Sequence, residues 1–144
     1  MRYVLHYFGP NLIKDALTNI RSQMKAGELL IHHTLCTDTE KDGSVMNYFF
    51  QKFVGIYNKS HKWIPAFNQI EELINSTGFI ITDIKNADLA SYSQDIITSR
   101  YKITKKNIEE IKQFAKNNSC KLYSETQQGI HLDLPSRYFC CQAV

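Results

Sequence analysis

The pattern of apolar and polar positions in the first 36 residues predicts a helix between two strands. Between residues 12 and 24 the apolar positions recur at spacings of three and four, which is typical of a helix with one buried face; they are Leu12, Ile13, Ala16, Leu17, Ile20 and Met24. Pro10 suits the first turn of this helix, and Gly27 can take the left-handed conformation that ends one. The apolar runs Tyr3-Val4-Leu5 and Leu29-Leu30-Ile31 lie on either side, and such runs are typical of strands buried on both faces of a parallel sheet. This order predicts a strand–helix–strand unit, the building block of an α/β layer.

The middle of the chain repeats the order of helix, glycine and strand. Residues 66–76 carry one apolar face, Thr77-Gly78 ends this helix, and Phe79-Ile80-Ile81 resumes as a strand. Between the two units, residues 37–43 are polar and predict a loop, and residues 44–57 predict a helix that Ser44 caps. This helix is apolar over more than one face. It is therefore either a core helix or a cover for a partner, a pocket or a further part of the protein.

The last third of the chain predicts further helices and a strand that closes the sheet. The expected elements are a short helix within 89–101, a helix over 105–117 capped by Thr104, a strand over 121–126, a half-buried strand over 130–134 that Pro135 interrupts, and a final strand over 137–144 antiparallel to the others. Two helix–strand units followed by these elements favour the α/β class.

Composition narrows the class of protein. The chain has 144 residues, of which 43% are hydrophobic and 22% charged, as in an ordinary globular domain, so we expect residues 1–144 to form a single domain. The net charge is +3 and the 17 basic residues are scattered, which argues against nucleic-acid binding. No apolar run reaches the roughly 20 residues of a membrane helix, and no signal peptide precedes Arg2. These features predict a cytoplasmic protein with no membrane association.

The cysteines and histidines do not form a recognisable metal site. The four cysteines include no C-x-x-C pair, and they are expected to be free, packed thiols; they are Cys36, Cys120, Cys140 and Cys141. His32 and His33 alternate to opposite faces of a strand, so they cannot easily share one ion. We therefore expect no metal.

Several segments together resemble the second half of class I S-adenosylmethionine-dependent methyltransferases, and within them the small-molecule O-methyltransferases. Those enzymes show a strand that ends in Leu-His or Ile-His, a helix that ends in Lys-Ser-Gly or similar, a strand of the Leu-Leu-Ile-His-Glu type, and a tryptophan or arginine before a helix ending in Ala-Gly-Phe. The corresponding segments here are Tyr3-Val4-Leu5-His6-Tyr7-Phe8, Ile20 to Gly27, Leu29-Leu30-Ile31-His32-His33, Trp63 and Thr77-Gly78-Phe79.

The resemblance implies part of a methyltransferase fold. The expected architecture is a partial Rossmann-like methyltransferase sheet, mixed, with its last strand antiparallel and helices on its flanks. In this family S-adenosylmethionine is held by a glycine-rich turn after the first strand and by an acidic residue upstream. All six glycines of this chain are isolated, and no G-x-G occurs. We therefore expect S-adenosylmethionine as the cofactor, with its binding motif absent from this chain and the N-terminal cofactor half missing.

The resemblance also supplies candidate site residues. A histidine at the position of His6 acts in plant-type enzymes as the general base that takes the proton from the acceptor hydroxyl. A carboxylate at the position of His33 helps to hold that base, and this chain departs from the family there. We take Tyr7 and His33 as substrate-binding candidates beside His6. Four further aromatic residues are expected either to line an acceptor pocket or to pack in the core; they are Tyr48, Phe49, Phe53 and Trp63.

Two functions remain open from the sequence. The first is the C-terminal part of a methyltransferase that transfers a methyl group to the hydroxyl of a small molecule. The second is a non-catalytic α/β interaction module, or a truncated pseudo-enzyme, that retains half of the fold. In both cases the first strand lacks the neighbours it has in the family, which predicts a homodimer or a separate N-terminal half that covers it.

Overall fold

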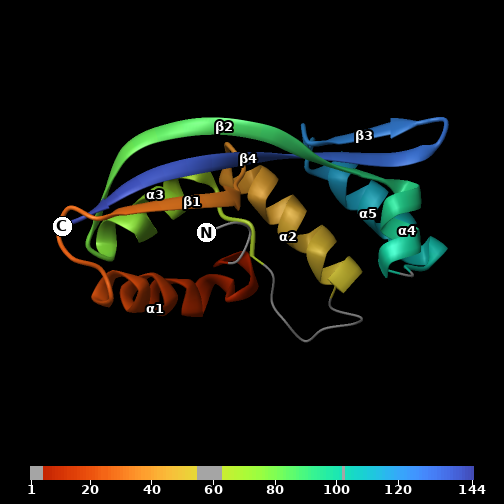
Figure 1. Ribbon diagram of the computed structural model, residues 1–144. Helices are drawn as coiled ribbons and strands as arrows, with labels where there is room; N and C mark the ends of the chain where they lie inside the picture. Colours follow the sequence, from red (N-terminus) through yellow and green to blue (C-terminus); the bar gives the residue numbers. More distant parts are fainter. Residues whose placement is uncertain (1–4, 55–62, 102) are drawn as a thin grey trace.

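The computed structural model describes residues 5–54, 63–101 and 103–144, and it shows a sheet with helices packed against it (Figure 1). In chain order the elements are a 3₁₀ turn at Leu5–Tyr7, α1 at Gly9–Ser22, β1 at Leu29–Leu35, α2 at Glu40–Val54, α3 at Phe67–Ser76, β2 at Phe79–Ser93, α4 at Gln94–Tyr101, α5 at Lys105–Asn117, β3 at Tyr123–Thr126 and β4 at Gly129–Ala143. The predicted α/β class is confirmed. Among the described residues, no helix is both long enough and apolar enough to cross a bilayer.

β4 lies at the centre of the sheet. The strand order is β1-β4-β2, and β3 also pairs with β4; each of these pairings is antiparallel. β1 and β2 therefore run in the same direction on either side of β4, which confirms that the closing strand is antiparallel to its neighbours. β1 differs from its prediction as a strand buried on both faces, because Leu29 and Ile31 are 68% and 54% exposed.

The two halves of β4 bury opposite faces. In the first half the even-numbered residues are buried, and Ile130, Leu132 and Leu134 pack with the helices α2, α4 and α5. From Phe139 onward the odd-numbered residues are buried instead, and they pack with α1 and α3. In Figure 1, α1 and α3 lie toward one end of the sheet, α4 and α5 lie toward the other, and α2 lies between them. A single twisted strand thus contributes to two hydrophobic clusters.

Pro135 lies inside β4 and does not interrupt it, contrary to our prediction. β2 has a bulge at this level: Ala87 pairs with Ser136 and Ala90 pairs with Leu134, so β2 carries one extra residue opposite the proline. The carbonyl of Pro135 still accepts a hydrogen bond from the amide of Cys36, at 3.1 Å. Pro135 has no N–H group to donate, and the bulge interrupts the hydrogen bonds between β2 and β4 at this position. β4 therefore continues past Pro135.

The boundaries of α2 and α4 also differ from the prediction. α2 begins at Glu40 rather than at Ser44, because Thr39 caps it: the hydroxyl of Thr39 accepts from the amide of Asp42, at 3.1 Å. Gly43 therefore lies within the helix, where a Cβ would come 3.0 Å from the Thr37 hydroxyl oxygen. The short helix expected within 89–101 begins only at Gln94, since the preceding residues extend β2 and pair with β4.

Local signals predicted the other helices well. α3 and α5 lie where the periodicity places them, and the Thr104 hydroxyl accepts from the amide of Asn107 as expected of a cap. Gly78, with φ of +84°, follows the C-cap of α3 as predicted. Gly27 also has a left-handed φ of +88°, but it lies in the turn before β1, because α1 already ends at Ser22; the prediction that Gly27 ends this helix is wrong. In α1, Ile13 and Leu17 of the predicted stripe are buried and Ala16 and Ile20 are half-buried, but Leu12 is 56% exposed. Leu12 lies about 100° around the helix axis from Ile13, at the margin of the stripe.

The N-terminal strand prediction is only partly described. Tyr3 and Val4 lie outside the described residues, and Leu5 belongs to a 3₁₀ turn rather than to a strand.

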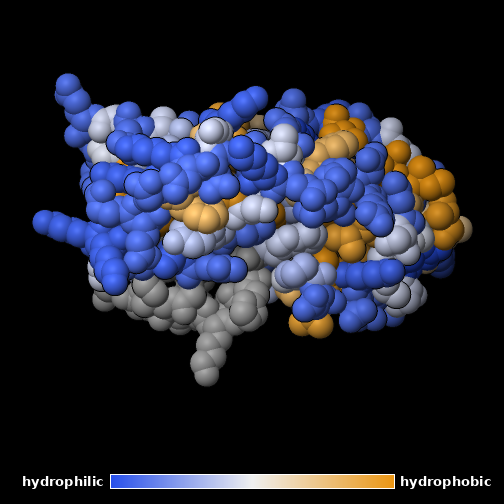
Figure 2. Space-filling model, turned by 180° about the vertical axis from the view of Figure 1, so that it is seen from behind, coloured by the Kyte–Doolittle hydropathy of each residue, from blue (hydrophilic) through white to orange (hydrophobic). Residues whose placement is uncertain are grey.

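One face of the sheet carries exposed apolar side chains opposite the α1 and α3 layer. Leu29 and Ile80 both pair with Gln142, so their side chains share a face, and Ile31 and Tyr138 add to it. In Figure 2 apolar side chains gather at the end of the molecule where β1 and β2 begin. Apolar patches of this kind often mark interaction sites.

We propose that this surface drives self-association. Light scattering at micromolar concentration should give a mass above the 16.7 kDa of one chain, rising with concentration. Leu29→Lys combined with Ile80→Lys should return the mass to that of one chain, because two charges cannot be buried unpaired. Leu12→Lys, on the helix layer across the sheet, should leave association unchanged. A native mass of 16.7 kDa at every concentration would contradict the proposal.

Candidate functional site

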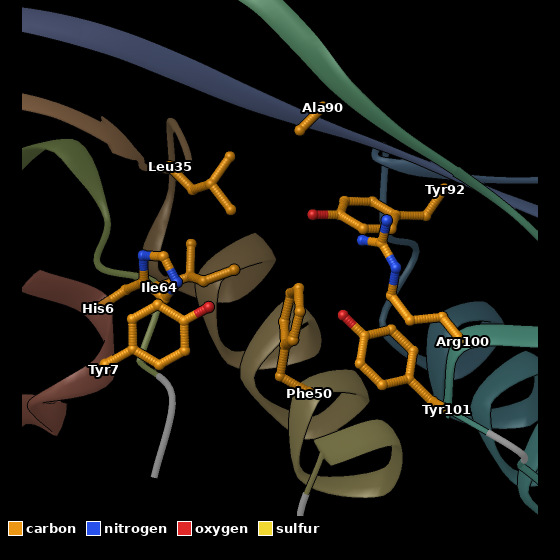
Figure 3. A pocket seen from close by; sticks show the side chains of 9 residues that line it. All are labelled: His6, Tyr7, Leu35, Phe50, Ile64, Ala90, Tyr92, Arg100 and Tyr101. Carbon is orange, nitrogen blue, oxygen red and sulfur yellow. The ribbon is translucent and has the colours of Figure 1, made fainter. Parts of the chain in front are cut away.

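A cavity of about 200 Å³ lies beside the carboxyl end of β1 (Figure 3). Its lining comes from the 3₁₀ turn, β1, α2, the segment before α3, β2 and α4, and comprises His6, Tyr7, Leu35, Phe50, Ile64, Ala90, Tyr92, Arg100 and Tyr101. The crevice outside the carboxyl ends of strands is where open α/β sheets bind their ligands. The cavity is therefore the candidate functional site.

His6 and Tyr7 form one side of the cavity. The backbone holds His6 in place, since its carbonyl accepts a hydrogen bond from the amide of Trp63, at 2.9 Å. The imidazole is buried, and its ring centroid lies 4.2 Å from that of Tyr7. The structure thus brings together the predicted base and one predicted substrate-binding residue.

The opposite side comes from residues that our sequence reasoning did not select. Figure 3 shows the phenol oxygens of Tyr92 and Tyr101 and the guanidinium of Arg100 turned toward the space between the two walls. The ring of Phe50 lies between these walls and meets Tyr92 edge to face, with ring centroids 6.2 Å apart. The sequence offered one indirect signal, the aromatic run that contains Phe50. Nothing in the spacing of residues 92, 100 and 101 indicates that they face the predicted base.

His33 is anchored to the neighbouring strand. Its Nε2 lies 3.1 Å from the hydroxyl oxygen of Ser136, and that hydroxyl donates to the carbonyl of Asp88, at 2.9 Å. Because the serine proton is used in the second bond, Nε2 of His33 is the donor in the first. The imidazole also stacks on Tyr138, with ring centroids 4.1 Å apart. These bonds join β1, β4 and β2 next to the cavity, although His33 itself does not line it.

The other predicted aromatic residues lie elsewhere. Tyr48 stacks on Phe114 with ring centroids 4.0 Å apart, so it faces α5. Phe49 is fully buried in the core. Trp63 packs against the cluster around Phe139 and lines shallow grooves beside Pro10. None of these three lines the cavity, and the side chain of Phe53 lies outside the described part of the structure.

The two adjacent histidines of β1 point to opposite faces. His32 is fully buried on the α1 and α3 side, where its ring lies 6.4 Å from that of Phe139. Neither of its ring nitrogens has a hydrogen-bond partner among the described residues. Burial therefore lowers the pKa of His32 to about 3. Over the described ranges no three His, Cys, Asp or Glu side chains are grouped to hold a metal ion.

The buried His32 should make the protein sensitive to acid. The pKa is 6.5 in the unfolded chain and about 3 in the folded one, so the unfolded state binds the proton first. The stabilisation is complete above pH 6.5 and is lost as the pH falls toward 3, by up to about 1.4 kcal/mol per pH unit. We expect His32→Leu to flatten the loss of unfolding free energy between pH 7 and pH 4, measured by urea denaturation.

The half-buried His131 supplies the control for this experiment. It pairs with Asp133 on β4, away from both hydrophobic clusters. His131→Leu should retain the steep acid dependence of the native chain. Equal slopes for the native chain and His32→Leu would contradict the assignment.

Comparison with known proteins shows the fold of the chain. No protein-family model matches the sequence, and no curated protein matches it. The chain superposes on a candidate methyltransferase of Bacillus halodurans C-125 with a TM-score of 0.76 at 12% identity, covering 95% of this chain and 60% of that one. The YcgJ protein of Bacillus subtilis matches with a TM-score of 0.73 at 11% identity, covering 99% of this chain and 61% of that one.

These likenesses establish a methyltransferase-like α/β fold, in agreement with the resemblance found in the sequence. The chain spans about 60% of the length of the two solved structures.

The described residues do not form a complete site for S-adenosylmethionine. None of those that line the cavity is a glycine, and none is an aspartate or glutamate. Gly78 follows the C-cap of α3, Gly27 lies in the turn before β1, and Gly43 lies within α2 close to the Thr37 hydroxyl. The described lining of this cavity therefore provides neither a glycine turn nor a carboxylate of the kind that this cofactor requires.

Proposed function

We propose that this chain is the substrate-side part of an S-adenosylmethionine-dependent methyltransferase, closest to the small-molecule O-methyltransferases, and that it binds an acceptor hydroxyl. The observation that supports this most is the position of His6: a buried imidazole in an aromatic-walled cavity at the strand ends of a methyltransferase-like fold. The cofactor half would be a part of the fold that this chain does not contain.

In this proposal His6 accepts the proton of the acceptor hydroxyl. Neutral imidazole is well suited to this role near pH 7. The cavity wall of Tyr7, Phe50 and Ile64 excludes water around the acceptor and orients it. His33, which stands where the family has a carboxylate, is bonded to Ser136, and we assign it a structural role in joining β1 to β4.

A second function is a non-catalytic interaction module. The exposed apolar face of Leu29, Ile31 and Ile80 favours it, because such a face is suited to a partner. The two functions differ in what the cavity does: only the enzyme requires His6 to contact a small molecule.

The 144-residue chain alone should bind S-adenosylmethionine weakly or not at all, because it lacks the groups that hold this cofactor. Isothermal titration calorimetry with the purified chain measures this directly. A dissociation constant in the low micromolar range would mean that the described cavity, or another surface of this chain, holds the cofactor after all.

In a complete enzyme that contains this chain, His6→Ala should lower turnover by roughly 10²–10⁴-fold, which is the usual contribution of one general base. The KM for the acceptor should change much less, since the aromatic walls remain. His131→Ala is the matched control, because His131 lies on β4 outside the cavity lining, and it should leave turnover unchanged. Unchanged turnover in His6→Ala would exclude the base role.

A further inference from the structure

The cavity contains a cation without a matching anion. Arg100 is in the last turn of α4 and lines the cavity, and Figure 3 shows its guanidinium turned toward the space between the two walls. Among the described residues Arg100 forms no ion pair, and the described lining includes no carboxylate. The ionisable groups of the lining are thus a guanidinium, an imidazole and three phenols. At neutral pH such a set favours an anion over a cation.

The cavity also has two distinct ends. His6 and Tyr7 occupy one side, while Arg100 and two tyrosines occupy the other (Figure 3). The ring of Phe50 lies between them, and Leu35 and Ile64 add apolar lining near His6 (Figure 3). A ligand that satisfies all three regions has a polar hydroxyl at one end, a flat apolar body, and an anionic group at the other end.

We propose that the cavity binds a small hydroxylated aromatic carboxylate, with the carboxylate at Arg100 and the ring against Phe50. The guanidinium offers a planar fork of donors that matches a carboxylate, and the hydroxyls of Tyr92 and Tyr101 can add hydrogen bonds. Phe50 supplies an aromatic face for the ring. The orientation of the hydroxyl toward His6 rests on the proposed function, whereas recognition of the anion by Arg100 does not.

The size of the cavity restricts the ligand further. Pockets for drug-sized ligands are roughly 300–1,000 Å³. At about 200 Å³ this cavity suits a molecule with a single ring. The anion is therefore expected on the same small molecule as the ring, rather than on a large attached group.

Binding of two probes that differ only in charge tests this proposal. We would measure dissociation constants of 4-hydroxybenzoate and 4-hydroxybenzamide for the 144-residue chain by ligand-observed NMR. Because Arg100 is exposed, the acid should bind roughly threefold to tenfold tighter than the amide, a range between that of a surface ion pair and that of a charged hydrogen bond. In Arg100→Gln the two affinities should become equal, through weakening of the acid alone.

Two further variants control for charge and folding. Lys121→Gln removes an exposed cation outside the cavity and should keep the preference for the acid. Arg100→Lys keeps the positive charge without the planar fork of donors, and it should keep part of the preference for the acid. Unchanged affinity for the amide shows that the cavity is intact in each variant. If Arg100→Gln binds neither probe, the test rests on Arg100→Lys, in which the preference for the acid should be reduced.

Three results would overturn the proposal: equal affinity for acid and amide in the native chain, a preference that survives both Arg100 substitutions, or no binding of either probe. The outcome is separable from the proposed function. A complete enzyme that methylates neutral phenols as well as their acids would retain the proposed function and contradict this inference. A preference for the acid that depends on Arg100, in a complete enzyme that shows no methyl transfer, would support this inference and contradict the proposed function.

Discussion

The pairing of β4 with every other strand is the constraint on which the rest of the described structure depends. β1, β2 and β3 hydrogen-bond to β4, and its two halves bury opposite faces against two groups of helices. A strand can do this because its side chains alternate and because sheets twist along their length. The change of buried face falls between Ser136 and Phe139, close to the cavity. The cavity therefore lies near the junction of the two hydrophobic clusters.

The same region connects the strands by side-chain hydrogen bonds. Ser136 on β4 bonds to His33 on β1 and to the carbonyl of Asp88 on β2. Asp88 lies in the bulge of β2, and the strand then continues through Ala90 to Tyr92, both of which line the cavity. The bulge that accommodates Pro135 thus also sets the position of the far cavity wall. A change at Ser136 or Pro135 would consequently act on the site through β2, without any contact with a ligand.

The chemical groups that line the cavity can be compared with what a methyltransferase-like fold needs to bind. A methyltransferase-like sheet normally brings a cofactor and an acceptor together at its strand ends. In this chain the strand ends carry aromatic walls, an imidazole and a guanidinium, which suit an acceptor, and the described lining has none of the groups that suit the cofactor. The proposal that this chain is the substrate-side part of such a fold rests on this lining.

The sequence by itself located the helices and helix ends that are set by residues close together in the chain. Helical periodicity and a Thr cap located α5, and Gly78 with its positive φ located the end of α3. The three-dimensional structure decided which aromatic residues serve the cavity. Phe49 and Phe50 are adjacent in the same apolar run, yet they point about 100° apart on α2, and only the packing of that helix places Phe49 in the core and Phe50 at the cavity. Arg100 and His6 line the same cavity although more than 90 residues of sequence separate them, because β2 is long enough to carry α4 to the far wall. Pairing between distant strands fixes that length, and no local pattern reports it.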